Sequence, residues 1–240
     1  MSDFLSRGFN GSCVGTVSAV AGGLVGHPMA EFAARAETMR VTGISPFAFV
    51  QSTSVVSLVQ DAPSKALSAA PYVGCSFALL EAVSYGALGL HERDNTVWVR
   101  FGKAAVGGCL GGVLEAGMAS QAWLIPCTSL SRAVFFGVDA AVRPAVEARE
   151  REQQKTLWVP RLATSWYCAA VARIVSQPLW AICDAAHANN TSLVEARQGL
   201  MRRGGMQALY RGIGGNVVSA IGAAVTLTVY HLLRDQHPSM

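Results

Sequence analysis

Four charged residues interrupt apolar stretches of this chain, and they are the first candidates for chemistry. Lys65, Glu115, Arg132 and Arg173 each lie within or beside a run of small and apolar residues. Charged side chains are costly inside a membrane, so they pair with one another or contact a ligand. The four could therefore hold a charged solute. Glu115 could equally form a structural ion pair with Arg132 or Arg173, which is the simpler interpretation.

The stretches around these charges predict membrane helices. Only 14% of the 240 residues are charged, against ~25% in typical soluble domains, and the mean hydropathy is +0.33. The nineteen residues Gly212–Tyr230 carry no Asp, Glu, Lys or Arg and approach the ~20 apolar residues that span a bilayer. Buried parallel strands would instead form short runs rich in β-branched residues. The expected class is an all-α membrane protein.

The apolar runs and their breakers give six expected helices that form three pairs. Small residues recur at membrane-packing spacing, as in Gly11 and Gly15. The charged stretch Glu147–Thr156 is expected to be a solvated helix end or linker. We therefore expect one domain, residues 1–240, with three pseudo-repeats at about 1–90, 91–150 and 151–240. The expected helices lie near 9–39, 64–90, 98–124, 127–147, 157–187 and 211–235.

Other residue patterns favour structural roles. The six cysteines have no CxxC spacing, which predicts packing residues rather than a zinc site or disulfides. No HExxH, GxSxG, P-loop or GxGxxG pattern occurs in a suitable context, so we expect no enzyme. Basic residues do not alternate with aromatic ones as in nucleic-acid binders. We expect His27, His187 and His231 to be structural, and Trp98 and Trp158 to belong to an interfacial aromatic belt.

The segment "GGMQALYRG" carries a family resemblance. Gly205, Leu209, Tyr210, Arg211 and Gly212 resemble the turn that follows the third matrix helix of the mitochondrial carrier family. Members of that family are six-helix inner-membrane transporters built of three repeats. The resemblance extends from about residue 7 to residue 234. It implies a multi-pass protein of the mitochondrial inner membrane whose matrix-side turn begins the sixth helix.

The odd-numbered helices depart from the family motif P-x-[DE]-x-x-[KR], whose charges close the matrix side. The first helix keeps Pro28 but has alanine at both charged positions, and the third helix has no proline. The fifth keeps Pro178, with Trp180 and Cys183 at the charged positions. A ring of charges as in the family is therefore not expected. The degenerate motif consists of Pro28, Glu31, Arg35, Pro178 and Asp184.

The even-numbered helices keep about half of a second motif, [FY]-[DE]-x-x-[KR], which closes the opposite side in the family. The surviving residues are Glu81, Asp139, Tyr230 and Arg234, and the resemblance implies a partial network among them. Substrate contacts in the family precede this motif by three to four turns. The corresponding stretches are Ser68–Tyr72, Pro126–Leu130 and Ser219–Gly222, and none of them carries a charge.

The chain is also shorter than the family pattern. The first pair keeps room for a matrix surface helix at Gly43–Val59, and the third pair keeps room at Thr191–Arg203. Between the third and fourth helices only "AWLIPC" remains. We therefore expect the second surface helix to be missing.

These departures favour a carrier-fold protein that has lost transport. The expected function is that of an accessory subunit of a mitochondrial inner-membrane complex, such as a respiratory or ATP synthase assembly. The alternative is a divergent solute carrier that transports a small metabolite by alternating access. The expected partners are membrane lipid and other subunits of such a complex, with no nucleic acid. No cofactor is expected, other than a bound phospholipid such as cardiolipin.

Overall fold

All the secondary structure in the described part of the chain is helical, which confirms the all-α class. The computed structural model describes residues 2–42, 54–90, 96–153 and 157–236. The elements are α1 (Ser2–Thr42), α3 (Val55–Val59), α4 (Ala62–Leu79), the π-helix η1 (Leu80–Ala87), α5 (Val97–Met118), the 3-10 helix η2 (Ala122–Leu124), α6 (Ile125–Gln153), α7 (Trp158–Asn189), α8 (Leu193–Leu209), α9 (Ile213–Ser219) and α10 (Ile221–Gln236).

Five helical stretches in the described residues are long and apolar enough to cross a membrane. They are Leu5–Ala36, Val56–Ala87, Val97–Met118, Ala122–Gln153 and Ile213–Gln236. Helix α7 is as long as the others but is not among these five. The reason is its polar content, because Arg173 and Gln177 interrupt its apolar centre.

Several helix ends differ from the expected ones. The second expected helix continues from α4 into η1, and the third ends at Met118. The charged stretch after Glu147 belongs to α6 as far as Gln153, so it is a helix end. The sixth expected helix divides into α9 and α10. Residues 119–124, between α5 and α6, hold only η2, so no second surface helix is present there.

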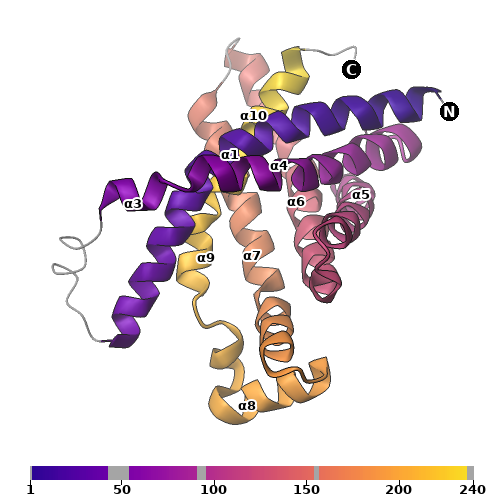
Figure 1. Cartoon of the computed structure of the whole chain (residues 1–240). Helices are drawn as coiled ribbons and strands as arrows, with labels where there is room; N and C mark the ends of the chain where they lie inside the picture. The colour runs from indigo at the N-terminus through magenta and orange to yellow at the C-terminus, as the bar shows by residue number, and fades with distance from the viewer. Residues whose placement is uncertain (1, 43–53, 91–95, 154–156, 237–240) are drawn as a thin grey trace.

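Of the two other expected surface helices, the later one is described completely and the earlier one in part. Helix α8 covers the segment expected at Thr191–Arg203 and continues to Leu209. For the segment Gly43–Val59, residues 43–53 lie outside the described residues, and α3 is its described part. In Figure 1 α8 lies at the bottom of the molecule, whereas the ends of α1 and α10 marked N and C lie at the top.

The long helices pack as a ring in chain order. Helix α1 packs on α4, α4 on α5, α5 on α6, α6 on α7 and α7 on α10, and α10 returns to α1. Helix α1 contains Pro28, which removes a backbone hydrogen bond and bends a helix. Figure 1 shows α1 bent, so that one arm lies along α4 and the other runs away from it.

Glycines allow two of these helix pairs to approach at backbone distance. A Cβ atom on Gly26 of α1 would lie 2.7 Å from the Cα atom of Gly222 in α10. A Cβ atom on Gly112 of α5 would lie 2.6 Å from the Cα atom of Ser129 in α6. Such contacts are typical of membrane helices, where small residues permit close packing.

Helix α8 and the turn after it are defined by local interactions. Ser192 and Glu195 form a capping box, in which each side chain bonds the other residue's backbone amide. The hydrogen bond from the Ser192 amide lowers the pKa of the exposed Glu195 carboxyl. Gly205, with φ 58°, makes a kink inside α8, and Gly212, with φ 77°, lies in the turn that follows; both have a backbone conformation that favours glycine. Gly212 is the N-cap of α9, so the "ALYRG" segment does lead into the last helices.

We expect Gly26→Ala to destabilise the bundle, because the added methyl group has no space against α10. Overpacking of this kind costs about 1–3 kcal/mol, which corresponds to a melting temperature lower by roughly 2–12 °C. Thermal unfolding of the purified protein in detergent measures the loss. Gly102→Ala is the matched control, since a Cβ atom there has nothing within 4 Å. Equal melting temperatures for the two variants would contradict the close contact.

Candidate functional site

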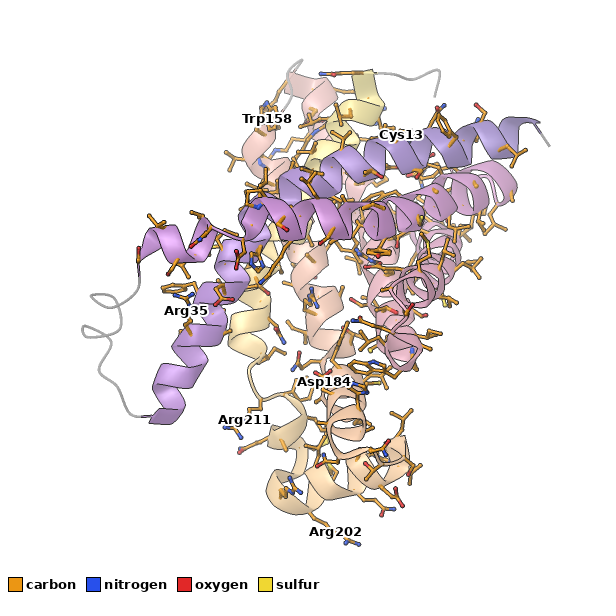
Figure 2. All side chains as sticks on the ribbon, in the orientation of Figure 1. Cys13, Arg35, Trp158, Asp184, Arg202 and Arg211 are labelled. Atoms are coloured by element: carbon orange, nitrogen blue, oxygen red, sulfur yellow. The ribbon has the colours of Figure 1, made fainter. Side chains whose placement is uncertain are left out.

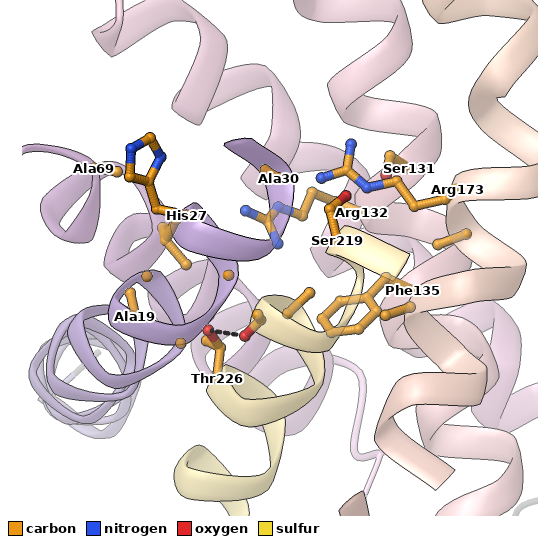
Figure 3. A pocket seen from close by; sticks show the side chains of 18 of the residues that line it. Ala19, His27, Ala30, Ala69, Ser131, Arg132, Phe135, Arg173, Ser219 and Thr226 are labelled. Atoms are coloured by element: carbon orange, nitrogen blue, oxygen red, sulfur yellow. Dashed lines mark hydrogen bonds between the residues drawn. The ribbon is translucent and has the colours of Figure 1, made fainter. Parts of the chain in front are cut away.

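A cavity of about 440 Å³ lies in the middle of the ring. Its walls come from α1, α4, α5, α6, α7, α9 and α10, and most of the lining residues are small or apolar. Exposed residues Ala30, Lys65 and Ala69 form part of the wall, so the cavity reaches the surface. Figure 3 shows Arg132 and Arg173 reaching into this space from their helices.

All four charged candidates from the sequence line this one cavity. Glu115 and Arg132 form a two-pronged ion pair, with distances of 2.7 Å from Nε to Oε2 and 2.9 Å from Nη2 to Oε1. Ser76 of α4 donates a further hydrogen bond to Glu115 Oε2 at 2.9 Å. The pair therefore links α5 to α6 with its hydrogen bonds well aligned.

Two cations of the cavity have no partner in the described part of the chain. Among the described residues, the side chains of Arg173 and Lys65 make no hydrogen bond or ion pair. With Arg132 neutralised by Glu115, the charged residues of the lining leave a net charge of +2. A positively charged, half-enclosed space of this size suits a small anion.

The expected substrate-contact stretches also reach the cavity. Each of the three stretches contributes at least one lining residue. These residues are Ala69, Thr128, Ser219 and Gly222. They are uncharged, so any ligand charge would be met by the cations on α4, α6 and α7 instead.

One end of the ring is closed by a network that joins opposite helices. Glu81 of η1 accepts hydrogen bonds from Arg234 Nε at 2.9 Å and from the Tyr230 hydroxyl. The Arg234 guanidinium lies 3.8 Å from the centre of the Tyr85 ring, a cation–π geometry. The pairing connects the second and last helices of the ring across its interior.

The same network continues to α6 and α7. Asp139 Oδ2 lies 2.9 Å from His231 Nε2, and Arg143 contacts the other ring nitrogen of His231. Asp235 accepts hydrogen bonds from Arg143 at 2.9 Å and from Arg161 at 2.8 Å. All the residues expected from the even-helix motif therefore take part. The further members are Arg143, Glu147, Glu150, Arg161, His231 and Asp235.

An aromatic layer separates this network from the cavity. Phe77 packs against Tyr230 with ring centres 4.2 Å apart and against Phe136 at 5.1 Å. All three side chains are almost completely buried. The layer and the network together form the closed end of the ring.

Among the described residues, the opposite end of the ring has no comparable network. Glu31 pairs with Arg35 on the same helix at 3.1 Å, and Arg35 donates to Ser57 of α3 at 2.9 Å. Pro178 lies inside α7, and Asp184 is exposed. Figure 2 shows Arg35 and Asp184 well apart on their two helices. In the described part of the chain, no ion pair joins the long helices of the ring at this end.

The turn residues lie beside this open end. Gln177 donates a hydrogen bond to the backbone oxygen of Arg211 at 3.2 Å and accepts one from Asn216 at 2.7 Å. The turn is thus anchored to α7, while the side chains of Tyr210 and Arg211 are exposed. Figure 2 shows Arg211 and Arg202 pointing away from the bundle.

Sequence reasoning did not assign Arg161, Glu150 and Ser76 to any site. Arg161 and Glu150 follow no motif, and Ser76 is one of many small residues on its helix. Arg143 carried a usable signal, because it lies four residues after Asp139 and four before Glu147, a spacing that pairs charges on a helix. Within the described residues, no group of three or more His, Cys, Asp or Glu could hold a metal ion.

We expect Glu81→Ala to destabilise the protein far more than Glu31→Ala. The Glu81 side chain is 8% exposed, and its loss leaves Arg234 and Tyr230 without their acceptor. Removing one partner of a buried ion pair costs about 3–5 kcal/mol. Glu31 belongs to a more exposed pair within one helix, worth about 0.3–0.5 kcal/mol. Chemical denaturation of both variants measures the difference, and equal losses would refute the role of Glu81.

Comparison with known proteins gives no further assignment. No protein-family model matches the chain, and no curated protein matches it. The likeness to mitochondrial carriers therefore remains an interpretation of the residues quoted above.

Proposed function

We propose that this chain is a carrier-like membrane protein that does not transport and instead serves as an accessory subunit of a mitochondrial inner-membrane complex. A respiratory or ATP synthase assembly is the proposed setting. The observation that supports this most directly is the difference between the two ends of the ring. One end has a network of ion pairs across the ring, and the other has none among the described residues.

Alternating access requires that each end can close in turn around a central site. The residues that would close the second end are absent from this chain. Ala30 and Ala33 occupy the charged positions after Pro28, and Trp180 and Cys183 occupy those after Pro178. Glu31 and Arg35 are already paired with each other. Among the described residues, closing contacts occur at one end of the ring and not at the other. This arrangement favours a bundle that keeps one conformation.

The proposal includes a sixth membrane crossing by α7. This helix has 32 residues and packs in the ring between α6 and α10. Its Arg173 lines the cavity, so that charge need not face lipid. Six crossings in three pairs, with the turn at Tyr210 on the matrix side, are the arrangement that the carrier resemblance implies. The short link at residues 119–124 also fits a protein whose surface helices no longer take part in transport.

A solute carrier is the second candidate, and the cavity is the observation that favours it. Arg173 and Lys65 remain unpaired there, and the indole Nε1 of Trp180 in the same wall has no partner among the described residues. Two cations and a free donor would suit a small anion such as phosphate or a dicarboxylate.

We expect the tagged protein to migrate with a large complex after mild detergent extraction of mitochondria. Native electrophoresis gives the mass, and mass spectrometry identifies the proteins that migrate with it. Constant stoichiometry with the subunits of one respiratory or ATP synthase complex is the expected result. Migration as a detergent-bound monomer would contradict the proposed function.

We also expect liposomes that contain the purified protein to take up no more labelled phosphate or malate than empty liposomes. Uptake above that background would favour the second candidate. In that case Arg173→Gln should reduce the uptake, since it removes one of the two unpaired cations of the cavity. Arg197→Gln on α8 is the control, because Arg197 is exposed and does not line the cavity.

A further inference from the structure

His231 is a buried, titratable link between two helices of the closed end. Its side chain is 8% exposed and contacts Asp139 and Arg143, both on α6. Helices α6 and α10 are separated in the ring by α7. The His231 contacts therefore cross the ring, rather than joining neighbouring helices.

The partners of the two ring nitrogens define one state of this histidine. Arginine can only donate hydrogen bonds, so the Nδ1 atom that faces Arg143 must accept. The Nε2 atom then carries the proton and donates to Asp139 Oδ2 at 2.9 Å. Only the neutral tautomer with its proton on Nε2 satisfies both partners. A second proton would place an N–H group of His231 against an N–H group of Arg143.

The surroundings add charges of both signs. Helices α6 and α10 contribute both acids and arginines, and α7 and η1 complete the shell. The titratable and charged groups that face the site are Asp139, Arg143 and Glu147 on α6, Arg161 and Cys168 on α7, Glu81 and Tyr85 on η1, and Tyr230, Arg234 and Asp235 on α10. Arg143 also bonds Glu147 and Asp235, so it keeps partners if it leaves His231.

A small polar cavity gives protons a route to this histidine. It has a volume of about 20 Å³ and is lined by Asp139, Arg143, Thr164, Ser165, Thr228 and His231, among others. That volume suffices for one water molecule with several polar partners. Glu147 also lines this space, and its side chain is 41% exposed. A single water could therefore connect His231 to the aqueous phase.

We propose that His231 is a proton-sensitive latch of the closed end. In its neutral form it holds Arg143 and Asp139 and so ties α10 to α6 across the ring. Protonation at Nδ1 replaces the acceptor by a donor, so His231 and Arg143 repel each other and this one link between α10 and α6 is lost, whereas the hydrogen bond from Nε2 to Asp139 and the Arg143–Asp235 pair remain. The closed end then loosens in mildly acidic solution, near and below the ordinary histidine pKa of about 6.5.

The first test compares thermal unfolding at pH 7.5 and pH 5.5 in detergent. His231→Gln keeps one acceptor and one donor but cannot be protonated. We expect the wild type to lose at least about 4 °C more between the two pH values than His231→Gln, because only the wild type can take up a proton at this position. His187→Gln is the control, because His187 stacks on Trp123 in another part of the bundle. Equal losses in the wild type and His231→Gln would overturn the latch.

The second test uses the wild type alone and therefore does not depend on how a variant folds. Cys168 of α7 is buried beside Asp139, whereas Cys183 is buried in a separate apolar cluster with Cys127 and Leu124. Both thiols react more slowly with N-ethylmaleimide as the pH falls, so the ratio of their labelling reports local opening. We expect the ratio of Cys168 to Cys183 labelling to rise at least threefold from pH 7.5 to pH 5.5. An unchanged ratio would overturn the latch.

Discussion

The ring depends on the direct backbone contact between its first and last helices. Gly26 and Gly222 lie where α1 and α10 meet, and neither position has space for a side chain. In a membrane no hydrophobic effect drives helices together, so close packing must supply the association energy. If α1 and α10 were held apart, the ring would be an open row of helices. The cavity and the closed end would then both be lost.

Once the ring is closed, its interior is divided into two unlike parts. The closed end satisfies its charges internally, because each arginine of the network meets at least one carboxylate. In the cavity, Glu115 pairs with one of the three cations, and the other two have no partner among the residues that the structure describes. The ion pairs of the closed end hold the helices in place, whereas the unpaired cations of the cavity remain free to bind an anion. The aromatic layer of Phe77, Phe136 and Tyr230 keeps the two apart.

The sequence predicted the features that depend on local pattern. Uncharged runs identified the long helices, and charges within those runs identified the residues that line the cavity, because burial of a charge is rare enough to be informative. The turn before Gly212 was identified by glycine and by the resemblance. Less could be predicted where partners come from distant segments. Nothing near His231 in the chain indicates that it meets Asp139 and Arg143, and the π-helix after Leu79 follows no simple residue pattern.

In the membrane setting proposed above, the unpaired cations of the cavity would also affect how voltage is distributed across the protein. Arg173 and Lys65 cannot remain in a dry apolar space, so the cavity must contain water or a counter-ion. A water-filled cavity has the electrical potential of the solution to which it opens. A membrane potential, about 2.3 kcal/mol per elementary charge for each 100 mV, would then fall mainly across the closed end. The charged groups that experience the steepest electric field are therefore those of the closed end.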